Sequence, residues 1–217
     1  MTGFPPCPLC SGSDPVFFQS DGLRDYLQCR RCRIVFVPPG QHLDNRAERA
    51  QYDLHENDPD DPRYRRFLSA LSEPVQARLT GPSRGLDFGC GPGPALAAMF
   101  VEAGHTMAVY DRYYADDRAV LEQSYDFIVT SEVVEHLRQP GDELDRLWSL
   151  LRPGGLLGIM TLLVAPGADF SRWHYARDPT HICFFSRETF AWLGQRWRSP
   201  PEFPGDRVVL FRKPAAR

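Results

Sequence analysis

The chain has 217 residues, 42% of them hydrophobic and 24% charged, which is enough for one sizeable core and a small appendage. Its formal net charge of −3 gives no overall attraction to nucleic acid or to an anionic membrane. No apolar run approaches the ~18 residues of a membrane span, and the N-terminus lacks the basic and apolar regions of a signal peptide. We therefore expect a cytoplasmic protein. Lys213 is the only lysine among 25 basic residues, a bias typical of a GC-rich bacterial genome.

Four of the six cysteines form two pairs near the N-terminus, in the pattern C-x2-C-x18-C-x2-C. Two such knuckles resemble a zinc ribbon with four sulfur ligands, in which the ion substitutes for a core that so short a segment could hardly supply. Because no ligand position is left open, the zinc is expected to be structural. Cysteines at metal spacing also favour a reducing compartment over a disulfide framework. The predicted zinc ligands are Cys7, Cys10, Cys29 and Cys32.

A polar, acidic stretch follows at 41–62, and the helix expected after it is ended or bent at Pro74. Tyr52, His55 and Tyr64 flank this stretch, where they form either a lid over a ligand or part of an ordinary amphipathic helix. We therefore divide the chain into a zinc ribbon (1–40), a helical lead-in or lid (41–83) and a larger C-terminal domain (84–217).

From residue 84 onward, strand-like and helix-like segments alternate. Strands alternating with helices at this spacing predict an α/β fold with a mostly parallel sheet, and such sheets bind ligands at the carboxyl ends of their strands. Ser186 is the expected N-cap of the last helix. The predicted strands are 85–88, 106–110, 125–130, 156–161 and 207–212, and the predicted helices are 94–103, 142–151 and 187–197.

The most informative segment is the glycine-rich turn within Gly85–Pro94. A dinucleotide-binding G-x-G-x-x-G pattern starting at Gly89 would need Gly or Ala at position 94, which is Pro94, and a Walker A loop would need a lysine. What remains is D-x-G-x-G-x-G, followed 22 residues after Gly89 by Asp111 at the end of the next strand. A carboxylate at that place suits ribose hydroxyls, so the two features together indicate a nucleoside ligand.

Two further motifs narrow the assignment: Tyr125–Leu137 (YDFIVTSEVVEHL) and Leu151–Leu156 (LRPGGL). With the glycine motif, they resemble the ubiquinone-biosynthesis-type and type 11/12 families of class I S-adenosylmethionine (SAM)-dependent methyltransferases. This resemblance covers roughly 84–213 and implies a seven-stranded Rossmann-like fold, with the loop under the methionine of SAM and Asp111 on its ribose. The cofactor-binding residues it implies are Asp87, Gly89, Cys90, Gly91, Gly93, Asp111, Ser131 and Glu132.

One segment departs from the family pattern. Only residues 112–124 separate Asp111 from the next strand, where the family places a helix, a short strand and an acid that contacts adenine. Asp116 and Asp117 are the candidates for that contact. The shortened segment also motivates a non-catalytic alternative, in which the protein binds SAM without transferring its methyl group.

Glu132, Glu135 and His136 are spaced to share one face of a helix beginning at Glu132. The E-x-x-E-H cluster resembles the divalent-metal ligands of ubiquinone O-methyltransferases and of small-RNA 2′-O-methyltransferases, where a later histidine, here His181, completes the set. Such a site would hold Mg²⁺ or a similar ion. Alternatively, the acids act without a metal, through cofactor contact and helix electrostatics. The residues predicted to activate the acceptor are Glu135, His136 and His181.

The insertion 170–181 is dense in aromatic and titratable groups, with Trp173, His174 and Tyr175 as expected walls of an acceptor pocket. An ordinary turn with aromatic side chains in the core is the competing interpretation. We expect a small-molecule acceptor methylated on oxygen. An RNA methyltransferase that reads its substrate through the ribbon is the alternative, because Arg30, Arg31 and Arg33 form a small basic cluster.

Overall fold

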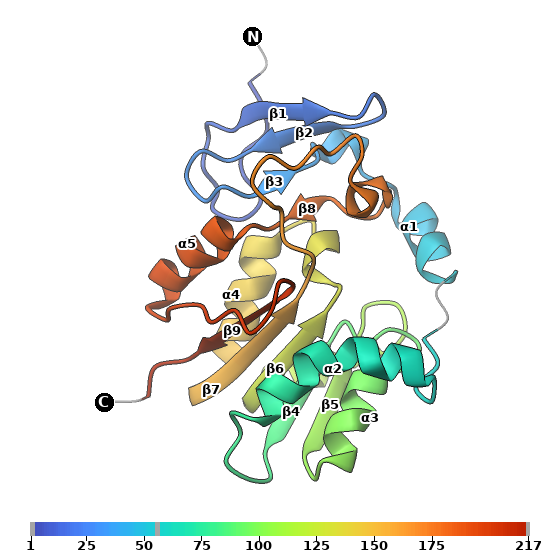
Figure 1. The fold of residues 1–217 in the computed structure, drawn as a ribbon, viewed down its shortest axis with the longest axis vertical. Coiled ribbons are helices and arrows are strands. Elements are labelled where there is room, and N and C mark those ends of the chain that lie inside the picture. Colours follow the sequence, from blue (N-terminus) through green and yellow to red (C-terminus); the bar gives the residue numbers. More distant parts are fainter. Residues whose placement is uncertain (1–2, 55–56, 216–217) are drawn as a thin grey trace.

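The computed structural model describes residues 3–54 and 57–215, which form two sheets (Figure 1). The first sheet has the strand order β1-β2-β3-β8 and the second the order β5-β4-β6-β7-β9. The strands are β1 (Val16–Ser20), β2 (Asp25–Gln28), β3 (Val35–Phe36), β4 (Arg84–Phe88), β5 (Thr106–Tyr110), β6 (Tyr125–Ser131), β7 (Leu151–Met160), β8 (Cys183–Phe184) and β9 (Val208–Arg212). The helices are α1 (Asn45–Tyr52), α2 (Pro62–Gln76), α3 (Ala95–Glu102), α4 (Pro140–Leu150) and α5 (Arg187–Trp197).

The larger sheet confirms the predicted α/β fold. Strands β5, β4, β6 and β7 are parallel, and β9 pairs antiparallel with β7. All five predicted strands are present, but the seven strands that the family resemblance implied are not: the sheet has five among the described residues. The segment 112–124 holds one short 3-10 turn, Arg118–Glu122, instead of a helix and a strand.

Helices cover both faces of this sheet (Figure 1). Side chains alternate along a strand, so Phe127 and Val129 of β6 join the cluster beneath α2 and α3, while Ile128 joins the cluster beneath α4. On the first face, Phe127 packs on Phe100 of α3 with ring centroids 4.8 Å apart. A Cβ added to Gly158 of β7 would lie 2.9 Å from a Val75 methyl group, so the glycine lets α2 lie directly on the sheet.

Local sequence signals account for the helix ends. Asp44 accepts hydrogen bonds from two backbone amides at the start of α1, and Asp61 accepts one at the start of α2. Ser186 caps α5 through a reciprocal bond pair with Thr189, as predicted. Helix α2 runs two residues past Pro74 and then ends. Among the described residues, no helix combines the length and apolar character needed to cross a membrane.

The smaller sheet joins the two ends of the chain. Strands β1, β2 and β3 come from the N-terminal segment, and β8 comes from the far end of the chain to pair antiparallel with β3. In Figure 1, the orange segment that leads into β8 lies against the blue N-terminal strands. The N-terminal unit, which we call the ribbon (residues 3–38), is therefore packed on a segment that follows β7.

Candidate active site

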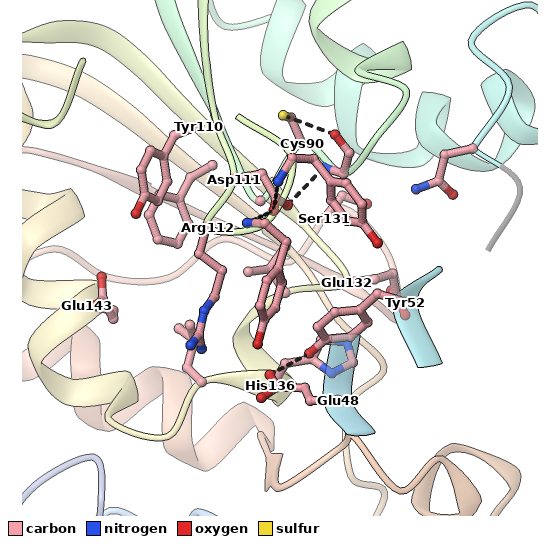
Figure 2. A pocket seen from close by; sticks show the side chains of 18 of the residues that line it. Glu48, Tyr52, Cys90, Tyr110, Asp111, Arg112, Ser131, Glu132, His136 and Glu143 are labelled. Atoms are coloured by element: carbon pink, nitrogen blue, oxygen red, sulfur yellow. Dashed lines mark hydrogen bonds between the residues drawn. The ribbon is translucent and has the colours of Figure 1, made fainter. Parts of the chain in front are cut away.

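A cavity of about 860 Å³ opens at the carboxyl ends of β4, β5 and β6. This is where a parallel α/β sheet binds its ligand. Its walls come from the loops after these strands, from α1 and the segment that leads into α2, and from the stretch between β7 and β8. Figure 2 shows Asp111 beside Cys90, with Tyr52 and Glu48 next to His136.

The glycine loop after β4 has a conformation that other residues would strain. Gly89 has φ +80°, and a Cβ added there would lie 2.3 Å from a Val133 methyl carbon. Gly91 has φ +64°. A Cβ on Gly93 would lie 1.8 Å from the Asn57 carbonyl oxygen, so the segment before α2 rests on the loop. Gly89, Cys90 and Gly91 line the cavity.

Asp111 stands one residue after β5, and three backbone amides hold its carboxylate. One oxygen accepts from the Gly91 amide at 3.1 Å, and the other accepts from the amides of Tyr113 at 2.8 Å and Tyr114 at 3.2 Å. The side chain also lines the cavity. The geometry therefore holds this carboxylate in one orientation between the glycine loop and the turn after β5.

Two of the predicted cofactor residues, Asp87 and Cys90, have buried side chains. Asp87 is 2% exposed and does not line the cavity. Burial raises the pKa of its carboxyl to about 7, the Asp111 carboxylate adds to the rise, and the Ala97 amide of α3 opposes it. Asp87 thus lies behind the cavity wall, bonded to the first turn of α3. Burial also raises the pKa of the Cys90 thiol to about 12, so Cys90 is a small neutral residue of the loop.

The acids considered for adenine are engaged elsewhere. Asp116 accepts hydrogen bonds from the Tyr110 hydroxyl and from Arg118, and Asp117 caps the 3-10 turn at the Ala119 amide. Neither lines the cavity, whereas Tyr110 and Leu121 do. At this end the cavity thus presents an aromatic ring and an aliphatic side chain, which sequence spacing alone did not indicate.

The predicted helix beginning at Glu132 is wrong. Glu132 adopts a left-handed φ of 53°, and only Val134–His136 form a single 3-10 turn. The reason is tertiary: the Glu132 amide donates to the Met160 carbonyl at 2.8 Å, which extends the β6–β7 pairing, while Val133 packs against Gly89. The E-x-x-E-H residues therefore do not share one helical face.

The predicted acceptor-activating residues nevertheless come together. One ligand atom from each of Glu135, His136 and His181 lies within 4.8 Å of the others, and the two imidazole rings are 4.7 Å apart. Glu132 is outside this group. We call Glu135, His136 and His181 the acid–histidine cluster. A chain reversal between β7 and β8 brings His181 to the turn after β6.

Tyr175 connects the cluster to Glu132, a role that its place in an aromatic insertion did not reveal. Its hydroxyl donates to a Glu135 oxygen at 2.5 Å and lies 3.2 Å from a Glu132 oxygen and 3.0 Å from the Thr161 hydroxyl. Its carbonyl accepts from Nδ1 of His181 at 2.7 Å. One residue thus positions both acids and the histidine.

Burial sets the protonation states of these groups. Burial first, and then the Glu135 carboxylate, raise the pKa of Glu132 to about 8. Burial likewise raises the pKa of Glu135. Burial and the neighbouring His136 lower the pKa of His181, which is therefore neutral at pH 7. Because a carbonyl only accepts, Nδ1 of His181 carries the proton and Nε2 carries the lone pair.

Helix α1 contacts His136 through Tyr52. The Tyr52 ring meets His136 edge-on at 5.2 Å and also contacts Tyr113, and its hydroxyl donates to the buried Glu48 at 3.0 Å. Tyr64 at the start of α2 lines the cavity, together with Tyr52 and His174. Both tyrosines therefore face the cavity, whereas His55 lies outside the described residues.

The ribbon cysteines form a second cluster. All four side chains are buried, and their Sγ atoms lie within 4.8 Å of one another. The Sγ atoms of Cys7 and Cys32 are 3.4 Å apart, and those of Cys10 and Cys29 are 3.5 Å apart. In each knuckle the first cysteine bonds to residues four and five positions later, through the same backbone pattern. Such a cluster is compatible with tetrahedral zinc.

A family model described as a methyltransferase domain matches residues 54–197, which is more than half of the chain. The chain belongs to this methyltransferase family. The matched residues include the glycine loop, Asp111 and the acid–histidine cluster. The chain is therefore a SAM-dependent methyltransferase. No curated protein matches this chain.

One solved structure shows the same fold, and two others resemble this chain more weakly. The 1,6-didemethyltoxoflavin N1-methyltransferase of Burkholderia thailandensis, with bound 1,6-didemethyltoxoflavin and S-adenosylhomocysteine, is 19% identical with a TM-score of 0.56, over 93% of this chain and 99% of that chain. DesVI of Streptomyces venezuelae is 15% identical with a TM-score of 0.49, over 81% and 100% of the chains. An O-methyltransferase family protein of B. thailandensis is 14% identical with a TM-score of 0.47, over 78% and 63%.

Proposed function

We propose that this methyltransferase transfers a methyl group to an oxygen of a small-molecule acceptor, with His181 as the base. The observation that carries the proposal is the placement of His181 in the same cavity as the glycine loop and Asp111. A cofactor on the loop and an acceptor beside the histidine would then meet within one enclosed space. Alignment of nucleophile and methyl group supplies most of the rate enhancement in such a transfer.

The residues present fit SAM on the cofactor side. The glycine loop leaves bare backbone where a Cβ would clash, and Asp111 presents an oriented carboxylate. Glu132 lines the cavity, and its Oε1 is buried and has no hydrogen-bond partner among the residues that the structure describes. A cationic group of SAM would satisfy this oxygen. Ser131 lines the same wall. When bound, SAM supplies an electrophilic methyl group on a sulfonium.

His181 performs the acceptor step in this proposal. Nε2 of the neutral imidazole accepts the hydroxyl proton as the acceptor oxygen forms its bond to the methyl carbon and the carbon–sulfur bond breaks, which leaves S-adenosylhomocysteine. Glu135, buried next to both histidines, stabilises the imidazolium that results. Tyr175 holds His181 in the required tautomer through its carbonyl.

The test is His181→Ala, with His174→Ala as a matched control from the same wall. We expect His181→Ala to lower turnover on hydroxyl acceptors by about 10²–10⁴-fold, the usual contribution of a general base, with SAM affinity nearly unchanged. His174→Ala should affect turnover far less. A large loss of SAM binding in His181→Ala would overturn the assigned role, as would methylated products in which nitrogen or carbon carries the new group.

The acid–histidine cluster is also the candidate site for the divalent ion considered from the sequence. Its donor set of two imidazoles and one carboxylate suits a transition metal better than Mg²⁺, which prefers oxygen ligands. Both carboxylate oxygens of Glu135 already accept hydrogen bonds from Thr161 and Tyr175. These bonds favour a metal-free cluster, and the metal content of the protein tests this preference.

The RNA alternative loses part of its support in the ribbon. Arg33 pairs with Glu188 of α5 at 3.1 Å, and the Arg31 guanidinium lies over the Trp192 ring at 5.9 Å. Two of the three basic side chains thus pack on α5. Steeply salt-dependent RNA binding that is lost in an Arg30→Ala, Arg31→Ala, Arg33→Ala triple variant would restore this alternative.

A further inference from the structure

The ribbon forms hydrogen bonds with the segment that carries His181. Arg24 lies in the turn between β1 and β2. Its guanidinium donates hydrogen bonds to four backbone carbonyls between residues 176 and 181. Nη1 donates to Pro179 at 3.3 Å and to His181 at 3.0 Å, and Nη2 donates to Asp178 at 3.1 Å and to Ala176. A planar guanidinium has five N–H donors, so it can donate hydrogen bonds to several carbonyls that lie outside strands and helices.

A second side chain of the ribbon holds the beginning of the same segment. The Gln19 amide nitrogen donates to the Ala168 carbonyl at 3.1 Å, and its amide oxygen accepts from the Phe170 amide at 2.9 Å. The side chain therefore bonds to this backbone as a neighbouring strand would. Phe170 itself is buried, with its ring 4.7 Å from Tyr26 and 5.4 Å from Phe18 of the ribbon.

The end of the segment is tied to the ribbon and to the cluster at once. The Val37 amide donates to the Ile182 carbonyl at 2.9 Å, and the Ile182 amide donates to the Glu135 carbonyl at 2.8 Å. Strand β8 then continues the pairing with β3. Ile182 is the residue next to His181, so the backbone of the histidine lies one peptide away from the ribbon and from the turn that carries Glu135.

The cofactor side of the cavity is held by other elements. The Asp111 carboxylate bonds to the glycine loop and to its own turn, and Asn57 packs on Gly91 and Gly93. The glycine loop and Asp111 thus have supports of their own, at the ends of β4 and β5, whereas the ribbon supports the acceptor-side segment. Tyr175 connects that segment to Glu132.

We propose that the ribbon is the positioning device for acceptor activation, with Arg24 as its principal positioning residue. Metal binding by the four cysteines would fix the start of β1 and the end of β2, and the pairing of these strands would carry that order to Gln19 and Arg24, which hold the segment 168–182. The glycine loop and Asp111 would be independent of this linkage, whereas Glu132 would feel it through its hydrogen bond with Tyr175. The proposal rests on the proposed role of His181 for its effect on turnover, but its structural part is testable without an acceptor.

The experiment compares full-length Arg24→Ala with Arg33→Ala, a matched control that removes another ribbon arginine whose partner is Glu188 on α5. Amide hydrogen exchange is followed across 168–182, S-adenosylhomocysteine affinity is measured by calorimetry, and zinc content is measured by elemental analysis. We expect exchange in 176–182 to accelerate at least about tenfold in Arg24→Ala, because charge-assisted hydrogen bonds are lost. Affinity for S-adenosylhomocysteine should change by less than exchange does, because the glycine loop and Asp111 are held by bonds that do not involve this segment.

Two further variants keep the test decisive if Arg24→Ala does not retain zinc. Arg24→Lys, which keeps the charge but not the planar set of donors, should give intermediate exchange, and guanidinium ion added to Arg24→Ala should restore part of the protection. Gln19→Leu should loosen 168–173 alone. Unchanged exchange in all of these variants, or equal acceleration in Arg33→Ala, would overturn the proposal even if His181→Ala still lowers turnover.

Discussion

At the scale of single residues, the site depends on groups whose surroundings set their charge. Glu132 stands where β6 ends, in a left-handed conformation that turns its carboxyl into the cavity. With a pKa raised to about 8 by burial and by Glu135, it is mostly protonated at neutral pH in the free protein. A cation bound beside it favours the carboxylate, so binding and proton release are linked.

This linkage predicts the pH dependence of SAM binding. Below pH 8 the carboxyl must lose a proton when the cation binds, so affinity should rise with pH by up to about tenfold per unit and then level off above pH 8. Calorimetry in buffers of different ionisation enthalpy measures the proton released. Glu132→Gln should flatten the profile. A flat profile in the wild-type protein would contradict the assignment of Glu132 to a cationic group.

The glycine loop gives a second prediction at this scale. Gly89→Ala places a methyl group against Val133 at a positive φ, so SAM affinity should fall by at least about tenfold, given strain of ~1–3 kcal/mol. Gly104→Ala is the control, since Gly104 also has a positive φ (+90°) but open space around it. That control should lower stability without changing SAM affinity. Equal affinities in both variants would show that the loop does not carry the cofactor.

At the scale of elements, local patterns predicted the strands and the capped helices because each has its own signal: alternating side chains, an N-cap, or a glycine turn. The helix expected at Glu132 failed for the opposite reason. Its i, i+3, i+4 spacing is a local signal, whereas the pairing of Glu132 with Met160 and the contact of Val133 with Gly89 come from distant parts of the chain. Tyr175 and Arg24 were likewise beyond prediction, because their partners lie far away in sequence.

The packing of α2 on the sheet predicts a difference between two leucines. Leu71 of α2 is fully buried, whereas Leu54 after α1 is 74% exposed. Leu71→Ala should lower the free energy of unfolding by about 2–5 kcal/mol, the usual cost of a cavity, and Leu54→Ala should change it by less than about 0.5 kcal/mol. Urea denaturation followed by circular dichroism measures both. Similar effects of the two substitutions would contradict the packing of α2 described above.

At the scale of the whole molecule, the chain folds back on itself. A segment from beyond β7 completes the N-terminal sheet and delivers His181 to the turn after β6. The sequence indicated the cysteine cluster and the cofactor loop separately, since both are compact motifs. The residues 33–37 around β3 have a strand-like pattern, but the sequence did not indicate that the ribbon and the acceptor wall share a sheet. The partner of β3 is the two-residue strand β8, which is too short to carry a recognisable pattern.

Metal content tests this organisation. We expect one zinc per chain, bound by the ribbon cysteines and retained in His181→Ala. Cys29→Ser should lose the metal and lower the melting temperature, because the ion contributes folding energy to so small a unit. Mass spectrometry of the native protein and elemental analysis give the count. Two metals per chain, one of them lost in His181→Ala, would place an ion in the acid–histidine cluster instead.

In the proposed site, one cavity binds SAM on the loop after β4 while His181 serves the acceptor. Calorimetric titration with SAM is the sharpest test of this division. The wild-type protein and His181→Ala should each bind one SAM per chain with similar affinity, whereas Asp111→Ala should bind it far more weakly. If the wild-type protein takes up no SAM, or if His181→Ala loses binding as fully as Asp111→Ala does, the account is contradicted.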